Sequence, residues 1–268
     1  MTDSTPLALT IAGSEATGGA GAQADLRTFQ AMDVFGMVAL TCIVSFDPKN
    51  DWGHRFVPVE PQVLADQLEA ITTAYPDDQL AVTKIGMLGT PDTIATVAAT
   101  LRDRAFEHVV LDPVLICKGQ EPGAALDTDT ALKEQVLPLA TFITPNHFET
   151  LSLSGMDSIE TVEELVEAAR RIHELSGAAV LAKGGVHLPG PEAIDVFVDD
   201  TTTEVLSAPK VGEVAVAGAG CTLAAAVTAA LAKGLEPLEA ARGAKEFVTA
   251  GIQSRLASAA PFDVVRQH

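Results

Sequence analysis

The segment Val216-Ala-Gly-Ala-Gly-Cys-Thr-Leu-Ala-Ala-Ala226 joins an alternating-glycine turn to an alanine-rich helix. The N-terminus of a helix exposes unpaired N–H groups and a partial positive charge, and glycine leaves room for an anion to reach them. We therefore expect Gly218, Ala219 and Gly220 to form an anion hole for a phosphate or a developing oxyanion. Cys221 would lie at its mouth, where the same field favours the thiolate. In the alternative interpretation, the glycines serve only helix packing.

Polar side chains follow three of the apolar runs that we expect to be strands. Asp112 ends one run, and Lys183 ends another beside two glycines. Asn146 and Glu149 follow the run between them. Carboxylate and amide oxygens at neighbouring strand ends suit Mg²⁺, which bridges phosphates and keeps several waters, and a lysine beside glycines suits a phosphate. The alternatives are a helix cap for Asn146 and Glu149 and a solvated surface position for Lys183.

An earlier glycine-rich loop, residues 13–25, contains Gly19-x-Gly21-x-x-Ala24 between a strand and a helix. This spacing is typical of the dinucleotide fingerprint of nicotinamide-dependent oxidoreductases, and Asp47 could serve as the ribose-binding acid. The fingerprint, however, needs its first glycine in the tight turn that leaves the strand, whereas seven residues separate Ile11 from Gly19. We therefore rank an oxidoreductase below a phosphate-handling protein. No Gly-Lys-Ser/Thr follows a glycine run, so a Walker A loop is not expected.

The charge balance excludes some partners. Thirty-six acidic residues against seventeen basic ones give a formal net charge of −19, which repels nucleic acids and anionic membrane surfaces. No apolar run approaches the ~20 residues of a membrane span, and export is not expected. Cys42, Cys117 and Cys221 are odd in number and show no Cys-x-x-Cys spacing, so we expect neither a disulfide framework nor a zinc cluster. We expect a cytoplasmic protein without nucleic-acid or membrane partners.

Short β-rich runs alternate with segments of helical periodicity along the chain. The expected strands are residues 7–11, 37–44, 81–85, 108–112, 141–144 and 178–182. The expected helices are residues 23–31, 60–74, 92–105, 128–137 and 159–175. This order predicts one α/β domain over residues 1–268, with a mostly parallel central sheet, helices on both faces and ligands at the carboxyl ends of the strands. Residues 193–198 and 203–206 are expected to add a hairpin to the sheet.

A series of short segments occurs in a fixed order along nearly the whole chain. The segments are Thr10-Ile-Ala-Gly-Ser14, Gly18-Gly-Ala-Gly-x-Gln-Ala-Asp-Leu26, Lys84-Ile-Gly-Met-Leu88, Leu111-Asp-Pro-Val114, Leu137-Pro, Ile143-Thr-Pro-Asn146, Lys183-Gly-Gly185 and Gly218-Ala-Gly-Cys-Thr222. Together they resemble the vitamin kinases of the ribokinase superfamily, in the branch of hydroxymethylpyrimidine kinases and related pyridoxal kinases. The segments Gly36 to Thr41, Trp52-x-His54 and Val114 to Gly119 resemble the pyridoxal kinases that carry a second cysteine in the flap over the substrate.

The resemblance implies a ribokinase-like three-layer sandwich and an activity. The protein would use ATP and Mg²⁺, with or without a monovalent cation, to phosphorylate the hydroxymethyl group of pyridoxal or a related B6 vitamer. Cys221 would replace the aspartate base of the sugar kinases, and Cys117 would assist its reversible addition to the substrate aldehyde. The resemblance also implies that the protein is a homodimer.

The resemblance also assigns roles to individual residues. Asp112 and Glu149 would bind the metal, and Asn146 and Lys183 would bind ATP. The substrate-binding residues would be Glu15, Gly21, Asp25, Phe46, Met87 and Cys117.

Three departures from the family pattern keep other functions open. Relatives usually carry Ser-Asp where this chain has Ser14-Glu15, and many carry Asn-His at Val216 and Ala217. Phe46 stands where pyrimidine kinases tend to carry glutamine, and a phenyl ring cannot pair with an aminopyrimidine edge. The alternatives are hydroxymethylpyrimidine or its phosphate as the substrate, and a non-catalytic protein that binds a B6 vitamer.

Overall fold

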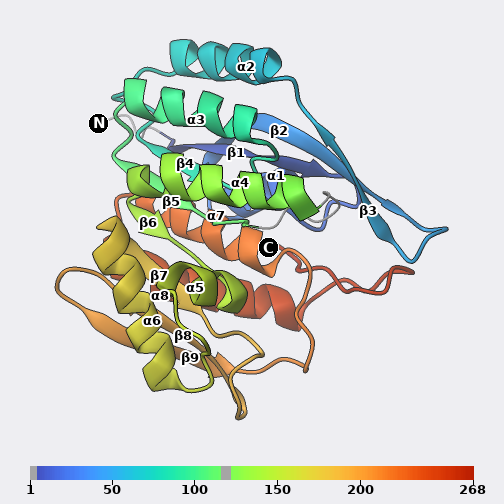
Figure 1. Ribbon diagram of the computed structural model, residues 1–268, viewed down its shortest axis with the longest axis vertical. Coiled ribbons are helices and arrows are strands. Elements are labelled where there is room, and N and C mark those ends of the chain that lie inside the picture. Colours follow the sequence, from blue (N-terminus) through green and yellow to red (C-terminus); the bar gives the residue numbers. More distant parts are fainter. Residues whose placement is uncertain (1–4, 116–121) are drawn as a thin grey trace.

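The computed structural model describes residues 5–115 and 122–268, whose strands form one mixed sheet (Figure 1). The strands are β1 (Leu7–Glu15), β2 (Phe35–Asp47), β3 (Gly53–Pro58), β4 (Val82–Ile85), β5 (His108–Leu111), β6 (Phe142–Ile143), β7 (Ala179–Lys183), β8 (Glu192–Val198) and β9 (Thr203–Pro209). Their spatial order is β3-β2-β1-β4-β5-β6-β7-β8-β9. In this spatial order, the neighbouring strands β2, β1, β4, β5, β6 and β7 pair in parallel. The edge strands β3, β8 and β9 pair antiparallel. The mostly parallel sheet and the appended hairpin expected from the sequence are confirmed.

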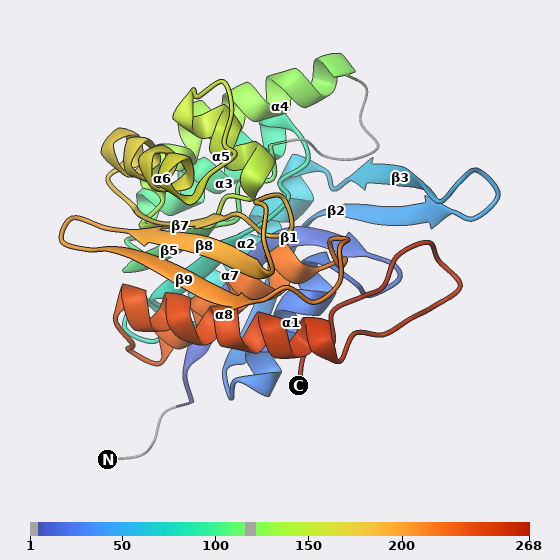
Figure 2. The ribbon, with the colours of Figure 1, turned by 90° about the horizontal axis from the view of Figure 1, so that it is seen from below.

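Helices cover both faces of the sheet, as Figure 2 shows. One face carries α2 (Pro61–Ala74), α3 (Pro91–Asp103), α4 (Pro122–Gln135), α5 (His147–Ser154) and α6 (Val162–Ser176), and a 3-10 turn, Leu137–Leu139, follows α4. The other face carries α1 (Gly21–Ala31), α7 (Ala219–Ala232) and α8 (Pro237–Gln253). The expected three-layer α/β architecture is therefore confirmed.

The strand β5 shows how the sheet is buried between these layers. Val109 and Leu111 pack in the core under α2 to α6, whereas Val110 packs on the opposite side with α7 and α8. A parallel strand covered on both faces is a continuous apolar run, which is why the sequence predicts it. No strand was expected at β3, because this edge strand is half-buried or exposed along its length and has no such run.

The helix α7 carries the glycine turn at its N-terminus. All residues from Thr222 to Leu231 are buried, because α7 packs against the sheet, α1 and α8 at once, and its alanines allow the close approach. This packing fixes the first turn of α7 beside the carboxyl ends of the central strands. Although α7 is apolar, no helix in the described part of the chain is long and apolar enough to cross a membrane.

Candidate active site

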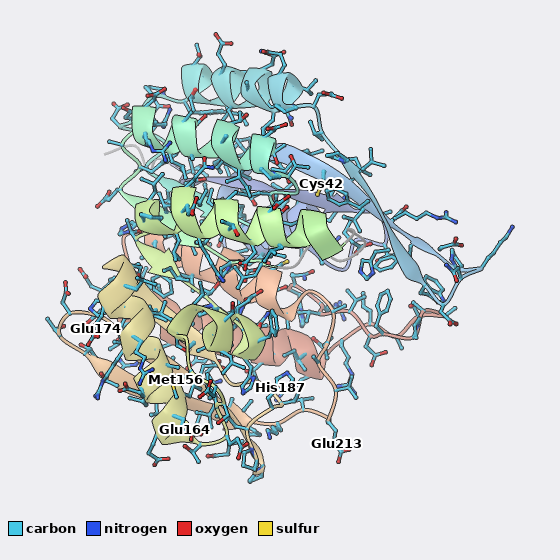
Figure 3. The ribbon with its side chains drawn as sticks, viewed as in Figure 1. Cys42, Met156, Glu164, Glu174, His187 and Glu213 are labelled. Atoms are coloured by element: carbon cyan, nitrogen blue, oxygen red, sulfur yellow. The ribbon has the colours of Figure 1, made fainter. Side chains whose placement is uncertain are left out.

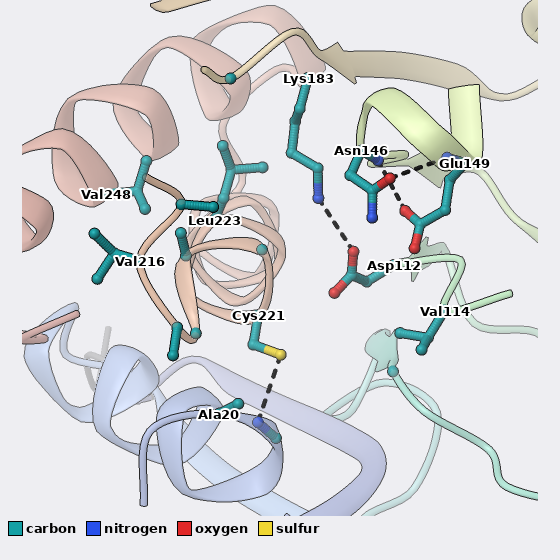
Figure 4. Close-up of a pocket in the computed structure, with 18 of the residues that line it drawn as sticks. Ala20, Asp112, Val114, Asn146, Glu149, Lys183, Val216, Cys221, Leu223 and Val248 are labelled. Atoms are coloured by element: carbon teal, nitrogen blue, oxygen red, sulfur yellow. Dashed lines mark hydrogen bonds and ion pairs between the residues drawn. The ribbon is translucent and has the colours of Figure 1, made fainter. Parts of the chain in front are cut away.

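A cavity of about 530 Å³ lies at the carboxyl ends of the parallel strands, where this topology predicts a ligand site. Its wall includes Gly13 of β1, Gly86 after β4, Asp112 after β5 and Lys183 at the end of β7. The first turn of α7 forms another wall, and Figure 4 shows the two sides in close-up. Most of the residues singled out from the sequence therefore meet in one place.

The turn before α7 uses its two glycines differently. Gly218 caps the helix with a left-handed backbone (φ 80°), and a Cβ there would lie 1.8 Å from the carbonyl oxygen of Gly19. Packing therefore requires glycine at position 218, and Gly218 also lines the cavity. A Cβ on Gly220 would instead lie 3.4 Å from Lys183 Nζ and 3.7 Å from Asp112 Oδ2. Gly220 keeps space free beside the charged groups of the cavity.

The N–H groups of this turn are not equivalent. The N–H of Ala219 donates to the carbonyl oxygen of Val216 at 3.3 Å, within the turn itself. The N–H groups of Gly220 and Cys221 follow in the first helical turn, whose donors have no acceptor inside the helix. The anion hole expected over Gly218, Ala219 and Gly220 stays a prediction, and the free donors of this turn are the N–H groups of Gly220 and Cys221 rather than that of Ala219.

Two carboxylates and a lysine lie beside this turn (Figure 4). Lys183 Nζ lies 3.2 Å from Asp112 Oδ1, and the Thr144 hydroxyl donates to the same oxygen at 3.5 Å. The Asp112 and Glu149 side chains are both nearly buried. Burial, reinforced by the negative charge of Asp112, raises the pKa of Glu149 to about 8, and Lys183 opposes that shift. A cation bound to these carboxylates would relieve their repulsion.

This donor set fits Mg²⁺ and substrate phosphates together. Within residues 5–115 and 122–268, no group of three or more His, Cys, Asp or Glu side chains could hold a metal ion by itself. Mg²⁺ commonly takes one or two carboxylates and completes its shell with water and phosphate oxygens. Asp112 and Glu149 supply two carboxylates, and Lys183 and the start of α7 provide the positive groups that a phosphate needs.

Asn146 and Glu149 cap the helix α5 and also line the cavity. The Glu149 N–H donates to Asn146 Oδ1 at 2.9 Å, and the Asn146 N–H donates to Glu149 Oε2 at 2.8 Å. This reciprocal capping box is the structural alternative left open by the sequence. It also fixes both side chains at the cavity wall, so the two interpretations are compatible.

Cys221 lies in the first turn of α7 and lines the cavity. Its sulfur accepts the backbone N–H of Gly21 at 3.4 Å. Burial raises the pKa of the thiol to about 11, although the ammonium group of Lys84 pulls it down. The field at the helix N-terminus acts in favour of the thiolate, but the cost of burying the charge acts against it, and on balance the pKa of the thiol is raised.

Asp25 lies behind the cavity wall rather than in it. Its carboxylate is fully buried, with Oδ2 2.9 Å from Lys84 Nζ and 2.6 Å from the Thr10 hydroxyl. Its Oδ1 has no hydrogen-bond partner among the described residues. The expected direct contact between Asp25 and the substrate ring is thus not what the structure shows. Lys84, which does line the cavity, was recognised only as part of a motif, since no local pattern pairs it with Asp25.

Glu15 organises the glycine-rich loop after β1. Its carboxylate accepts hydrogen bonds from the Thr17 N–H and hydroxyl, at 2.5 and 2.8 Å, and from the N–H groups of Gly19 and Ala20, at 2.8 and 3.2 Å. Glu15, which the resemblance assigns to the substrate, therefore directs its carboxylate to the N–H and hydroxyl groups of its own loop. It still borders the cavity. Gly21 follows with a positive φ of 62°, and a Cβ there would lie 2.2 Å from the Gly13 carbonyl oxygen.

Aromatic side chains form one end of the cavity. Phe46 and Met87 line it there, together with His54 of β3 and Phe262. The ring of Phe46 lies 4.8 Å from His54 and 5.1 Å from Phe262 between ring centroids. The sequence did not suggest Phe262, because nothing in its neighbourhood indicates that the chain returns to β2.

A further buried ion pair also lines the cavity. Lys245 Nζ on α8 lies 2.8 Å from Asp195 Oδ2 on β8, among apolar side chains that include Leu223 and Val248. Neither charged residue was expected from the sequence, because each sits inside an apolar helix or strand pattern. The rings of His147 and His187 stack on the wall as well, 4.9 Å apart between centroids, and Figure 3 labels His187.

Of the two remaining cysteines, Cys42 lies among the described residues and Cys117 does not. Cys42 is buried on β2 (Figure 3), and a Cβ on Gly13 would lie 2.5 Å from its sulfur. It is a core thiol that does not line the cavity. Cys117, expected to assist Cys221, lies outside the described residues, so its role stays a prediction.

Solved structures with this fold match over nearly the entire chain. An ADP complex of Bacillus subtilis pyridoxal kinase superposes with a TM-score of 0.88 and 43% identity, covering 98% of each chain. The Staphylococcus aureus pyridoxal kinase in complex with AMP-PCP and pyridoxal gives a TM-score of 0.88 and 37% identity, covering 98% of this chain and 93% of that one.

Sequence comparison gives the same result. A pyridoxine kinase of Bacillus subtilis is 48% identical over 246 residues, or 92% of this chain and 90% of that protein. A hydroxymethylpyrimidine/phosphomethylpyrimidine kinase of Synechococcus elongatus is 40% identical over 94% of this chain and 93% of that protein. The phosphomethylpyrimidine kinase family model matches residues 15–263. With relatives this similar and a family match across nearly all of the described residues, the chain belongs to the phosphomethylpyrimidine kinase family.

Proposed function

We propose that this chain transfers phosphate from ATP to the hydroxymethyl group of pyridoxal or a related B6 vitamer. The observation that carries the proposal is a cavity with two chemically different ends that meet at the start of α7. One end holds Asp112, Glu149 and Lys183, and the other holds Phe46 and Met87. A nucleoside triphosphate suits the charged end, and a small aromatic vitamin suits the apolar end. The 48% identical pyridoxine kinase supports the same assignment.

The charged end would hold the phosphates. Lys183 and the N–H groups of Gly220 and Cys221 would contact phosphate oxygens, where positive groups fixed in advance stabilise the charge of the transferring phosphoryl group. Asp112 and Glu149 would hold Mg²⁺. When bound, Mg²⁺ neutralises phosphate charge and helps to align the transfer.

Cys221 would act on the substrate hydroxyl. It lines the same cavity as both groups of residues, in the first turn of α7, so its sulfur would face the oxygen that attacks the phosphate. Since the pKa of the thiol is raised to about 11, only a small thiolate fraction exists near neutral pH, and that fraction is a strong base. Lys84 and the N–H of Gly21 are the groups that stabilise negative charge on this sulfur.

Hydroxymethylpyrimidine is the second candidate substrate. The description of the matched family, phosphomethylpyrimidine kinase, and the Synechococcus relative favour hydroxymethylpyrimidine as the substrate. Phe46 on the cavity wall speaks against it, because a phenyl ring offers no hydrogen bond to an aminopyrimidine.

A direct assay separates these functions. The protein is incubated with Mg²⁺, ATP and equal amounts of pyridoxal, pyridoxine, pyridoxamine and hydroxymethylpyrimidine, and the products are identified by mass spectrometry. We expect phosphorylated B6 vitamers to dominate. Phosphorylated pyrimidine alone would assign the second candidate. Saturable pyridoxal binding without ATP consumption would assign the non-catalytic binding protein.

We also propose a homodimer, which the family resemblance implies. Ile43 of β2 and Val57 of β3 are cross-strand partners and are 43% and 61% exposed. The β2–β3 hairpin that carries them projects from the body of the molecule (Figure 2), where a second copy could cover it. Sedimentation equilibrium of the wild type and of the double variant Ile43→Lys, Val57→Lys would test this, and a monomeric wild type would refute it.

A further inference from the structure

We infer that Phe262 forms part of the wall that holds the vitamin ring and thereby helps to select the ring. The inference deepens the proposed function and rests on it. Phe262 belongs to residues 256–267, which we call the C-terminal segment. In Figures 1 and 2 this red segment runs from the end of α8 toward the β2–β3 hairpin, more than 200 residues earlier in the chain.

The rings at this end of the cavity form a connected cluster. Phe262 lies 5.1 Å from Phe46 at an interplanar angle of 46°, and 6.1 Å from Trp52 at 83°. Phe46 in turn lies 4.8 Å from His54, edge to face. These distances are within the range of favourable aromatic pairs. Phe46, His54 and Phe262 all line the cavity, so the cluster presents ring surface to a ligand.

The backbone of the C-terminal segment is fixed on both sides of Phe262. Leu256 and Val264 exchange two hydrogen bonds, at 2.8 and 2.9 Å. The Ala217 N–H donates to the Asp263 carbonyl oxygen at 2.9 Å, and the Val265 N–H donates to the Ala217 carbonyl oxygen at 3.1 Å. Asp263, the residue after Phe262, is therefore hydrogen-bonded to the turn that leads into α7, which fixes the backbone of Phe262 relative to that turn.

A further contact ties the same segment to α7 itself. Gln267 Nε2 donates to the Thr222 hydroxyl at 2.9 Å, and Thr222 directly follows Cys221. The aromatic wall and the groups at the start of α7 are thus parts of one fixed frame. A ring that rests against Phe262 has its hydroxymethyl group held at a set position relative to Cys221 and Gly220.

The chemistry of this wall favours one class of ring. Phenyl side chains offer apolar area and a π face, but no hydrogen-bond donor or acceptor. A pyridine ring has one ring nitrogen that exchanges hydrogen bonds with water, whereas an aminopyrimidine has two and an exocyclic amine, so it gives up more of them against such a wall. Phe262 is on these grounds a specificity-determining residue for B6 vitamers.

Substitutions at Phe262 test the inference, with a matched control in the same segment. Phe262→Ala removes the ring, Phe262→Leu keeps an apolar side chain without a π face, and Leu256→Ala changes a side chain that is 54% exposed and outside the cavity wall. KM is measured separately for pyridoxal, pyridoxine, hydroxymethylpyrimidine and ATP, and the thermal midpoint is recorded. Trp52 is the sole tryptophan, so a change of its emission on adding pyridoxal without ATP reports binding independently of turnover.

We expect Phe262→Ala to raise KM for pyridoxal and pyridoxine about tenfold, with a smaller rise for Phe262→Leu. KM for ATP, the thermal midpoint and the Leu256→Ala control should change little. Unchanged vitamer KM values in Phe262→Ala would overturn the inference and leave the proposed kinase intact. Parallel losses for ATP, vitamers and stability would overturn it too, since they would mark a structural residue. If the wild type phosphorylates no vitamer, the proposed function fails, and the Trp52 titration still decides whether Phe262 contacts the ring.

Discussion

The backbone N–H of Gly21 donates to the sulfur of Cys221 at 3.4 Å across 200 residues of sequence. Gly21 is the first residue of α1, and Cys221 lies in the first turn of α7. The positive ends of two helices therefore converge on one sulfur atom, and both fields favour negative charge there. Cys221 is only partly exposed, and desolvation of its thiol nevertheless raises the pKa. This balance between burial and field determines how the enzyme should respond to pH.

The first prediction concerns that response. The pKa of Cys221 is raised to about 11, and a base acts in its deprotonated form. Turnover should therefore increase with pH, about tenfold per unit at pH values well below 11. We would measure kcat between pH 7 and 9.5 with pyridoxine, which has no aldehyde to react with the thiol, while circular dichroism monitors folding. Cys221→Ala should lose nearly all activity at every pH. A flat profile, or an active Cys221→Ala variant, would remove Cys221 as the base.

The second prediction uses the two glycines of the turn as a matched pair. Gly220→Val should place methyl groups beside Lys183 and Asp112, 3.4 and 3.7 Å from the position of the new Cβ. Turnover should fall on the order of a hundred- to a thousandfold, as for loss of an oxyanion contact, with the fold retained.

Gly218→Ala should give the opposite pattern. Its Cβ would collide with the Gly19 carbonyl oxygen at a positive φ, so this variant should lose stability first. Thermal denaturation and steady-state kinetics on both variants would check the contrast. If Gly220→Val fails to fold while Gly218→Ala stays fully active, the assignment of the two glycines is reversed.

The sequence predicts the parts of this molecule that depend on local pattern. The strands β4, β5 and β7 are runs of buried residues, and Asp112 and Lys183 sit at strand ends, which parallel topology brings together. Local pattern cannot show which distant residues meet. The family resemblance assigns Asp25 to the substrate, and no local pattern reveals that Lys84, 59 residues away, holds its carboxylate.

The pKa of Cys221 depends on packing that the sequence does not show. The sequence reveals the helix N-terminus that favours a thiolate, but it does not reveal how far the fold shields the sulfur from water. Asn146 and Glu149 illustrate a different limit, because one pair of side chains both caps a helix and lines the cavity. The sequence presented these roles as alternatives, and the structure shows that they coincide.

The third prediction tests the charged end of the cavity. Asp112→Asn should lower turnover and raise the Mg²⁺ concentration needed for half-maximal rate, because it removes one of two carboxylates that fit the metal. Its thermal midpoint should change little, since the Thr144 hydroxyl can still donate to the amide oxygen. Lys183→Ala should mainly raise KM for ATP. Initial rates over a grid of Mg²⁺ and ATP concentrations would separate the two effects. Unfolding of Asp112→Asn at ordinary temperature would make Asp112 structural instead.

The last prediction concerns the buried pair beneath Cys221. Burial alone would lower the pKa of Lys84, but the carboxylates of Asp25 and Asp112 raise it, so Lys84 remains a cation next to the thiol. Lys84→Met should leave Asp25 buried without its partner and cost about 3–5 kcal/mol of stability. The double variant Lys84→Met, Asp25→Leu removes both charges and should recover most of that loss. Its turnover should nonetheless stay low at neutral pH, because the cation that stabilises negative charge on Cys221 is gone. Urea denaturation measures the loss and recovery of stability. The rate of Cys221 alkylation by iodoacetamide at pH 8 measures how readily the thiolate forms without Lys84. A double variant that alkylates and turns over at the wild-type rate would reduce Lys84 to a structural partner of Asp25.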